Sequence, residues 1–157
     1  MFIAVCVEVA LKLLCMHYGA QANSSSPCLP ATSVQIVKWQ PPLAGLVKLN
    51  IDVALDIENN SMIGVGVVLR DHKGQVLGFS WQRFRGCFSP QVAEALAMLR
   101  GLHFALELGI NPCIVESDAS NVVELVNGHK VSLSEISLIV EIQNLLARCP
   151  NYVIFES

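Results

Sequence analysis

The sequence has few charged residues and no basic excess. Only 15% of its 157 residues are charged, and 10 Lys and Arg against 13 Asp and Glu give a net charge of −3. Such a chain has no global positive field to attract nucleic acid or an anionic membrane, so any contact with a polyanion must be local. Because 53% of the residues are apolar, an intrinsically disordered chain is also excluded. We therefore expect one globular domain.

The cysteines lack the spacing of a metal site. None of the six stands in a C-x-x-C pair, and no paired Cys/His spacing of the zinc type occurs. They are Cys6, Cys15, Cys28, Cys87, Cys113 and Cys149. We interpret them as buried, reduced thiols of an intracellular protein, nuclear or cytoplasmic.

No apolar run is long enough to cross a membrane. The most apolar stretch, residues 1–18, is interrupted by Glu8 and Lys12 and has no basic start, although the following Ala20-Gln21-Ala22 resembles a signal-peptidase site. We therefore expect neither a membrane span nor secretion. A secreted protein with paired cysteines is kept as a third interpretation and ranked last.

A linker separates this stretch from the domain. Residues 23–33 are rich in Ser and Pro and carry no periodicity, which is typical of a linker. We expect an N-terminal segment over residues 1–35 and a single domain over residues 36–157.

The best-marked element is a helix that begins after Ser89 and ends before Gly109. Ser89 can cap the helix, Pro90 suits its first position, and Gly109 can adopt the left-handed conformation that ends it. One helical stripe predicts a core face and a second, of small residues, predicts close approach to a sheet. The first stripe is Val92, Leu96, Leu99, His103 and Leu106, and the second is Glu94, Ala97, Gly101 and Ala105.

Strand patterns lie on both sides of this helix. Before it, apolar and polar residues alternate over residues 47–53, and residues 63–70 and 75–85 flank a short turn, which predicts a hairpin. After it come a short strand over 113–117, a short helix over 119–127, a longer helix opened by a capping box at 132–135 and running to Arg148, and a strand over 152–155. This order predicts an α/β fold with a mixed five-stranded sheet, three antiparallel strands followed by parallel ones, and helices packed on it.

Three acids fall at suggestive places in this fold. Asp52 lies on the first strand, Glu94 on the marked helix, and Asp118 at the end of the strand that follows it. Three carboxylates that meet repel one another unless cations neutralise them, and oxygen ligands suit Mg²⁺ or Mn²⁺. Three unrelated surface acids would fit the same sequence. Gly64 and Gly66 do not precede a helix, so a phosphate loop is excluded.

The residues around these acids resemble a known family. The relevant blocks, in order, are W-x-P-P-x-x-G at 39–45, KLNIDVA at 48–54, IGVGVVLRDHKGQVLG at 63–78, SPQVAEALAMLRGLHFALELGI at 89–110, IVESDASNVVELVN at 114–127 and SEISLIVEIQNLL at 134–146. Together they resemble the plant reverse-transcriptase-like branch of the ribonuclease H family, known from retrotransposon-derived genes. The resemblance covers roughly residues 37–157.

The resemblance implies a ribonuclease H-like fold and a two-metal hydrolase. Its three motif acids fall on Asp52, Glu94 and Asp118, which would bind two Mg²⁺ and cleave the RNA strand of an RNA–DNA hybrid. The nucleic acid would be recognised through its backbone and 2′-OH groups, with little dependence on sequence.

Two departures from the family pattern bear on activity. Val53 replaces the Gly of D-G-A, and the family's C-terminal helix, which carries a fourth acid, is missing after Ser157. His72 and His129 do not replace that acid, and we interpret them as surface histidines of a turn and a loop. We therefore expect activity to be weakened or lost. The alternative to an enzyme is a non-catalytic, retrotransposon-derived remnant that acts as a binding or interaction module.

Overall fold

The computed structural model describes residues 39–55, 62–128 and 136–156. The expected capping box at 132–135 and His129 lie outside these ranges, as do Cys6, Cys15 and Cys28. No helix among the described residues is long and apolar enough to cross a membrane.

A five-stranded mixed sheet forms the centre of the fold, in the order β3-β2-β1-β4-β5. The strands are β1 (Val47–Leu55), β2 (Met62–Arg70), β3 (Val76–Arg85), β4 (Cys113–Ser117) and β5 (Tyr152–Glu156). Strands β1, β2 and β3 are antiparallel, whereas β4 pairs in parallel with both β1 and β5. This is the mixed five-stranded sheet that the sequence predicted.

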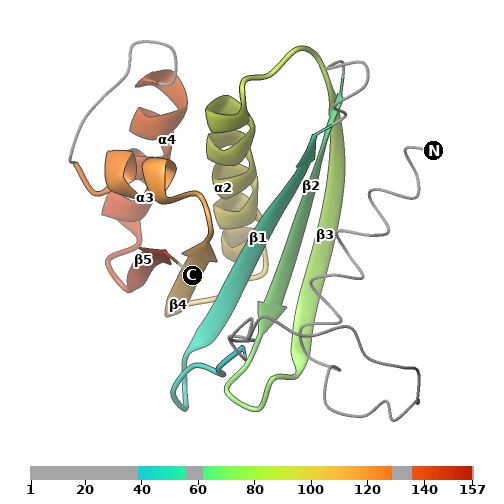
Figure 1. Ribbon diagram of the computed structural model, residues 1–157. Helices are drawn as coiled ribbons and strands as arrows, with labels where there is room; N and C mark the ends of the chain where they lie inside the picture. Colours follow the sequence, from blue (N-terminus) through green and yellow to red (C-terminus); the bar gives the residue numbers. More distant parts are fainter. Residues whose placement is uncertain (1–38, 56–61, 129–135, 157) are drawn as a thin grey trace, which may run out of the picture.

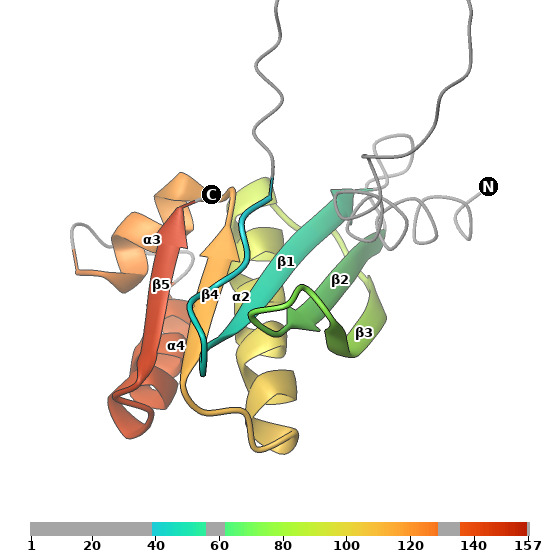
Figure 2. The ribbon, with the colours of Figure 1, turned by 90° about the horizontal axis from the view of Figure 1, so that it is seen from below.

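The helices cover one face of this sheet. They are α2 (Pro90–Glu107), α3 (Ser120–Val126) and α4 (Ile136–Arg148). Figure 1 shows all three on the same side, and Figure 2 shows α2 and α4 behind the strands. The core lies between the two layers, where Leu49, Met98, Val115 and Ile142 are fully buried. Among the described residues, no helix covers the opposite face of the sheet.

Helix α2 begins and ends where the sequence predicted. The Ser89 hydroxyl accepts a hydrogen bond from the Val92 amide at 3.2 Å, and Pro90 occupies the first turn. At the other end Gly109 has a φ of +68°, its amide donates to the Leu106 carbonyl, and the Ile110 amide donates to the Ala105 carbonyl. This pair of bonds is a Schellman motif, which satisfies carbonyls that the helix leaves open.

The two predicted stripes of α2 are buried to different depths, and the predicted close approach of the small stripe to the sheet is confirmed. The small stripe lies deepest: a β-carbon on Gly101 would lie 2.9 Å from Ile51 Cδ1 and 3.5 Å from Leu49 Cδ2. The stripe expected to form the core face is only half-buried at Val92, Leu96, His103 and Leu106, with Leu99 alone fully buried. Helix α2 can approach the sheet closely only where its side chains are small, so the larger residues lie beside this contact.

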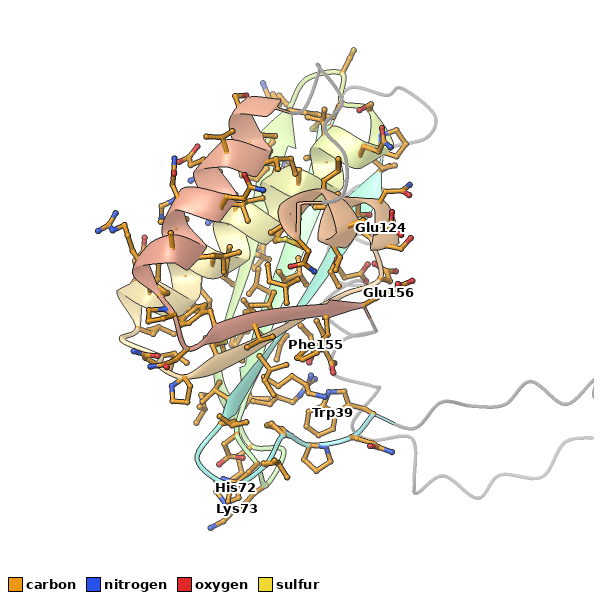
Figure 3. All side chains as sticks on the ribbon, turned by 90° about the vertical axis from the view of Figure 1, so that its left-hand side faces the viewer. Trp39, His72, Lys73, Glu124, Phe155 and Glu156 are labelled. Carbon is orange, nitrogen blue, oxygen red and sulfur yellow. The ribbon has the colours of Figure 1, made fainter. Side chains whose placement is uncertain are left out.

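The hairpin turn between β2 and β3 is organised by Asp71. Its carboxylate accepts hydrogen bonds from the amides of Lys73 at 2.8 Å and Gln75 at 2.9 Å, and Gly74 adopts a φ of +78°. His72 is exposed in this turn, as the sequence predicted (Figure 3).

Candidate functional site

Asp52 on β1 and Asp118, directly after β4, lie at equivalent places beside two neighbouring parallel strands. The paired register of β1 and β4 ends at Asn50 opposite Glu116. Asp52 and Asp118 each lie two residues beyond this last pair, at the carboxyl end of the pairing. Because side chains alternate along a strand, Asp52 lies on the same face of β1 as Asn50. That face is opposite to the one on which Ile51 meets α2.

Glu94 lies in the first half of α2 and is half-buried. Its pKa is raised from 4.5 to about 7, first because burial disfavours the charged form and then because the carboxylates of Asp118 and Asp52 repel it. The structure therefore brings the three acids into one electrostatically coupled group, drawn from β1, α2 and the end of β4. Of the two repelling neighbours, Asp118 has the larger effect on Glu94.

The three acids are coupled without a preformed ligand cage. Among the described residues, no group of three or more His, Cys, Asp or Glu side chains is arranged to hold a metal ion. The Asp52 carboxylate accepts a hydrogen bond from the Val53 amide at 2.9 Å, which holds it against its own strand. A shared metal site at Asp52, Glu94 and Asp118 thus stays a prediction.

Val53 does not crowd Asp52. It lies one residue from Asp52 on β1, so its side chain points to the opposite face, where it packs against the hydrophobic core. The replacement of the family's Gly therefore adds a side chain to the helix-covered side of the sheet.

A partly buried polar cluster lies on the same face of β1 as Asp52. We call it the Asn50 network, and it consists of Trp39, Lys48, Asn50, Arg70 and Glu116. Lys48 is 7% exposed and Arg70 only 1%. Figure 3 shows that Trp39 lies on the other side of β4 and β5 from helices α3 and α4.

The Asn50 network links three strands through Asn50 and Glu116. The Asn50 amide donates to Glu116 Oε2 at 3.0 Å, and its Oδ1 accepts from Arg70 at 3.2 Å and from Trp39 Nε1 at 3.3 Å. Lys48 Nζ lies 2.5 Å from Glu116 Oε1 and donates to the Gln40 carbonyl at 2.7 Å. The Lys48 and Arg70 cations each lie 5.3 Å from the centre of the Trp39 ring, within cation–π range.

This network was not predicted from the sequence. The signal was present in β1, where Lys48, Asn50 and Asp52 alternate with apolar residues and so share one face. That alternation identified a strand, but it does not show which residues of other strands meet these side chains. The two histidines within the described ranges are not part of the site: His72 is exposed, and His103 lies 3.8 Å from Glu141 on the helix surface.

Comparison with known families now identifies the domain. Residues 50–156, which include all three acids, match the family model described as reverse transcriptase-like. The chain belongs to the reverse transcriptase-like family. This confirms the family resemblance in its broad form. No curated protein matches the sequence significantly.

Several solved structures similar to this reverse transcriptase-like domain are ribonucleases H. RNase H1 from the halophilic archaeon Halobacterium salinarum NRC-1 is 20% identical, with a TM-score of 0.64 over 72% of this chain and 86% of that one. The N-terminal RNase H domain of Rv2228c from Mycobacterium tuberculosis is 25% identical, with a TM-score of 0.61 over 71% and 81%. LC11-RNase H1, solved in complex with an RNA/DNA hybrid, is 22% identical, with a TM-score of 0.62 over 71% and 84%. These similarities establish the ribonuclease H fold.

Proposed function

We propose that this reverse transcriptase-like domain hydrolyses the RNA strand of RNA–DNA hybrids with the help of Mg²⁺ or Mn²⁺. The observation that carries the proposal is the coupling of Glu94 to Asp118 and Asp52, three acids from separate elements of a ribonuclease H fold. Similar proteins support the choice of substrate, since LC11-RNase H1 was solved with an RNA/DNA hybrid. The blocks around the acids also resemble the plant, retrotransposon-derived branch of the family.

The donor set fits a hard divalent cation. Asp52, Glu94 and Asp118 offer only carboxylate oxygens, which Mg²⁺ and Mn²⁺ prefer over softer metals. Without a metal, the raised pKa of Glu94 keeps this carboxyl group protonated up to about pH 7, which reduces the repulsion among the three acids. A divalent cation would neutralise the negative charge of the three carboxylates more completely. When bound, such ions supply an activated water and stabilise the leaving oxygen of the phosphodiester.

The chain's own residues would hold and orient these carboxylates. The Val53 amide fixes one oxygen of Asp52, and the packing of α2 on β1 through Gly101 holds Glu94 above the carboxyl end of β1. No side chain is needed as a nucleophile. Because the net charge is −3, the hybrid would be held by local contacts to its backbone, so we expect little dependence on sequence.

A non-catalytic binding module is the second candidate. It is favoured by one observation, namely that none of the described acids are already arranged as metal ligands. In that case the three carboxylates would be retained from an active ancestor, and the domain would bind nucleic acid or protein without cleaving it.

A comparison of two acids on the same helix separates the two candidates. Glu94→Gln removes the coupled acid, whereas Glu107→Gln removes an exposed acid at the other end of α2. With a labelled RNA–DNA hybrid and Mn²⁺ or Mg²⁺, we expect cleavage by the wild type and by Glu107→Gln, and a loss of at least about 100-fold in Glu94→Gln and Asp52→Asn. Equal cleavage by all four proteins would refute the assignment of the acids. No cleavage by the wild type, with hybrid binding retained, would favour the binding module.

A further inference from the structure

The pairing of β1 and β4 ends on a side-chain bridge. Asn50 and Glu116 form the last backbone pair of the two strands, and across this pair the Asn50 amide donates to Glu116 Oε2 at 3.0 Å. Beyond it β1 continues to Leu55 without β4 as a partner. No ladder hydrogen bond therefore fixes the separation of the two strands where Asp52 and Asp118 stand.

Each residue of the bridge is held by a further partner. Lys48 contacts Glu116 Oε1 at 2.5 Å, and Arg70 from β2 donates to Asn50 Oδ1 at 3.2 Å. Both oxygens of the Glu116 carboxylate and both polar atoms of the Asn50 amide thus have partners, so the two side chains have little freedom to rotate. Trp39, from the segment that leads into β1, donates to Asn50 Oδ1 and places its ring near both cations.

A buried polar cluster of this kind is better suited to fixing geometry than to adding stability. Removing charged groups from water is costly, and a well-packed apolar set of equal volume is often at least as stable. The hydrogen bonds of such a network restrict the arrangement of its side chains, and they are strengthened where water is excluded. Water is largely excluded from Lys48 and Arg70, which are 7% and 1% exposed.

We propose that Asn50 and Glu116 are positioning residues that set the separation between the carboxylates of Asp52 and Asp118, and with it the affinity of the acid group for a divalent cation. The inference rests on the proposed function, because it concerns the same three acids. Two residues along a strand span about 6.6 Å, so a change in strand separation at the bridge is transmitted directly to both acids. Lys48, Arg70 and Trp39 hold Asn50 and Glu116 in place through the contacts described above.

Two substitutions at one position test the inference. Glu116→Gln keeps one carbonyl oxygen that can accept from the Asn50 amide but loses the ion pair with Lys48, whereas Glu116→Leu has similar bulk and no acceptor. Mn²⁺ binding to the full chain, measured by titration calorimetry, should weaken at least about tenfold in Glu116→Leu and stay within about threefold in Glu116→Gln, as for residues that orient metal ligands. Glu124→Leu, which removes an exposed acid of α3, is the matched control and should bind as the wild type does.

A second variant and a melting curve keep the test decisive. Asn50→Ser shortens the side chain so that it no longer reaches Glu116, and it should weaken Mn²⁺ binding as Glu116→Leu does, even if the latter fails to fold. If both variants melt at lower temperature but bind Mn²⁺ as tightly as the wild type, the network is structural and the inference is wrong. If the wild type itself binds no Mn²⁺, the proposed metal-dependent function fails first, and the inference fails with it.

Discussion

Gly101 on α2 faces Ile51 on β1 so closely that a β-carbon at position 101 would lie 2.9 Å from Ile51 Cδ1 and 3.0 Å from Ile51 Cγ1. This contact sets the distance between the helix and the sheet, and it explains why a glycine is kept inside a helix where it costs about 1 kcal/mol relative to alanine. Because Glu94 lies two turns before Gly101 on the same helix, the contact also determines how near that acid comes to Asp52.

Gly101→Leu should strongly destabilise the domain. The added side chain must displace Ile51 and Leu49 from a packed core, and overpacking costs about 1–3 kcal/mol in unfolding free energy, here expected near the upper end. Urea unfolding followed by circular dichroism would measure it. Glu107→Leu, at an exposed site of the same helix, is the control and should change stability by less than about 0.5 kcal/mol. Equal stability of both variants would show that α2 does not approach β1 as described.

The stability of the metal-free domain should fall as pH rises from about 4.5 to about 7. The pKa of Glu94 is raised to about 7 in the fold, mainly by burial, so the folded state holds this proton more tightly than the unfolded chain does. The stabilisation from this proton is complete below the pKa that Glu94 has in the unfolded chain. It is lost as pH rises through the pKa that Glu94 has in the folded state. Thermal melts in EDTA should show the decline in the wild type and in Glu107→Gln. Glu94→Gln should flatten it, and an unchanged slope in that variant would assign the decline to another group.

Asp118→Asn should lower the pKa of Glu94 more than Asp52→Asn does. Both acids raise that pKa by repulsion, and the effect of Asp118 is the larger of the two. Carbon-detected NMR titration of the Glu94 carboxyl group, without metal, gives the pKa of Glu94 in the wild type and in the two variants directly. In EDTA above pH 7 the melting temperature of Asp118→Asn should equal or exceed that of the wild type, because a mutual repulsion is removed. A lower melting temperature would instead identify Asp118 as a structural residue.

Ser89→Ala should weaken the start of α2. The Ser89 hydroxyl accepts from the Val92 amide at 3.2 Å, and loss of such a cap costs about 1 kcal/mol in unfolding free energy. Ser89→Asp restores an acceptor and should recover most of this loss. Chemical unfolding of the three proteins tests the expectation, and an Ala variant as stable as the wild type would show that solvent satisfies the Val92 amide equally well.

Much of the fold could be predicted from the sequence because its signals are local. The alternation in residues 47–53, the turn at 71–75 and the caps at Ser89 and Gly109 each depend on neighbours in the chain, and the structure confirms all of them. Glu94, Asp52 and Asp118 were predicted from their places in the expected fold and from the resemblance of the blocks around them to a known family.

The sequence did not predict the relative burial of the α2 stripes or the Asn50 network. The ranking of the stripes depends on how closely α2 approaches β1, a distance that helical periodicity does not contain. The Asn50 network joins Asn50 to Glu116 across 66 positions, and neither residue is marked by its immediate surroundings. Both features arise from the packing of one element on another.

The parallel pairing of β1 with β4 has a consequence for the order of folding. It joins residues far apart in the sequence, whereas β2 and β3 are joined by a short turn. Closing a long loop costs more conformational entropy than closing a hairpin, so contacts distant in sequence form more slowly than local ones. Asp118 is carried to Asp52 by this long-range closure. A partly folded chain that has its hairpin and α2 but not β4 therefore has an incomplete acid group, and nascent chains acquire this group only after β4 has been synthesised and docked.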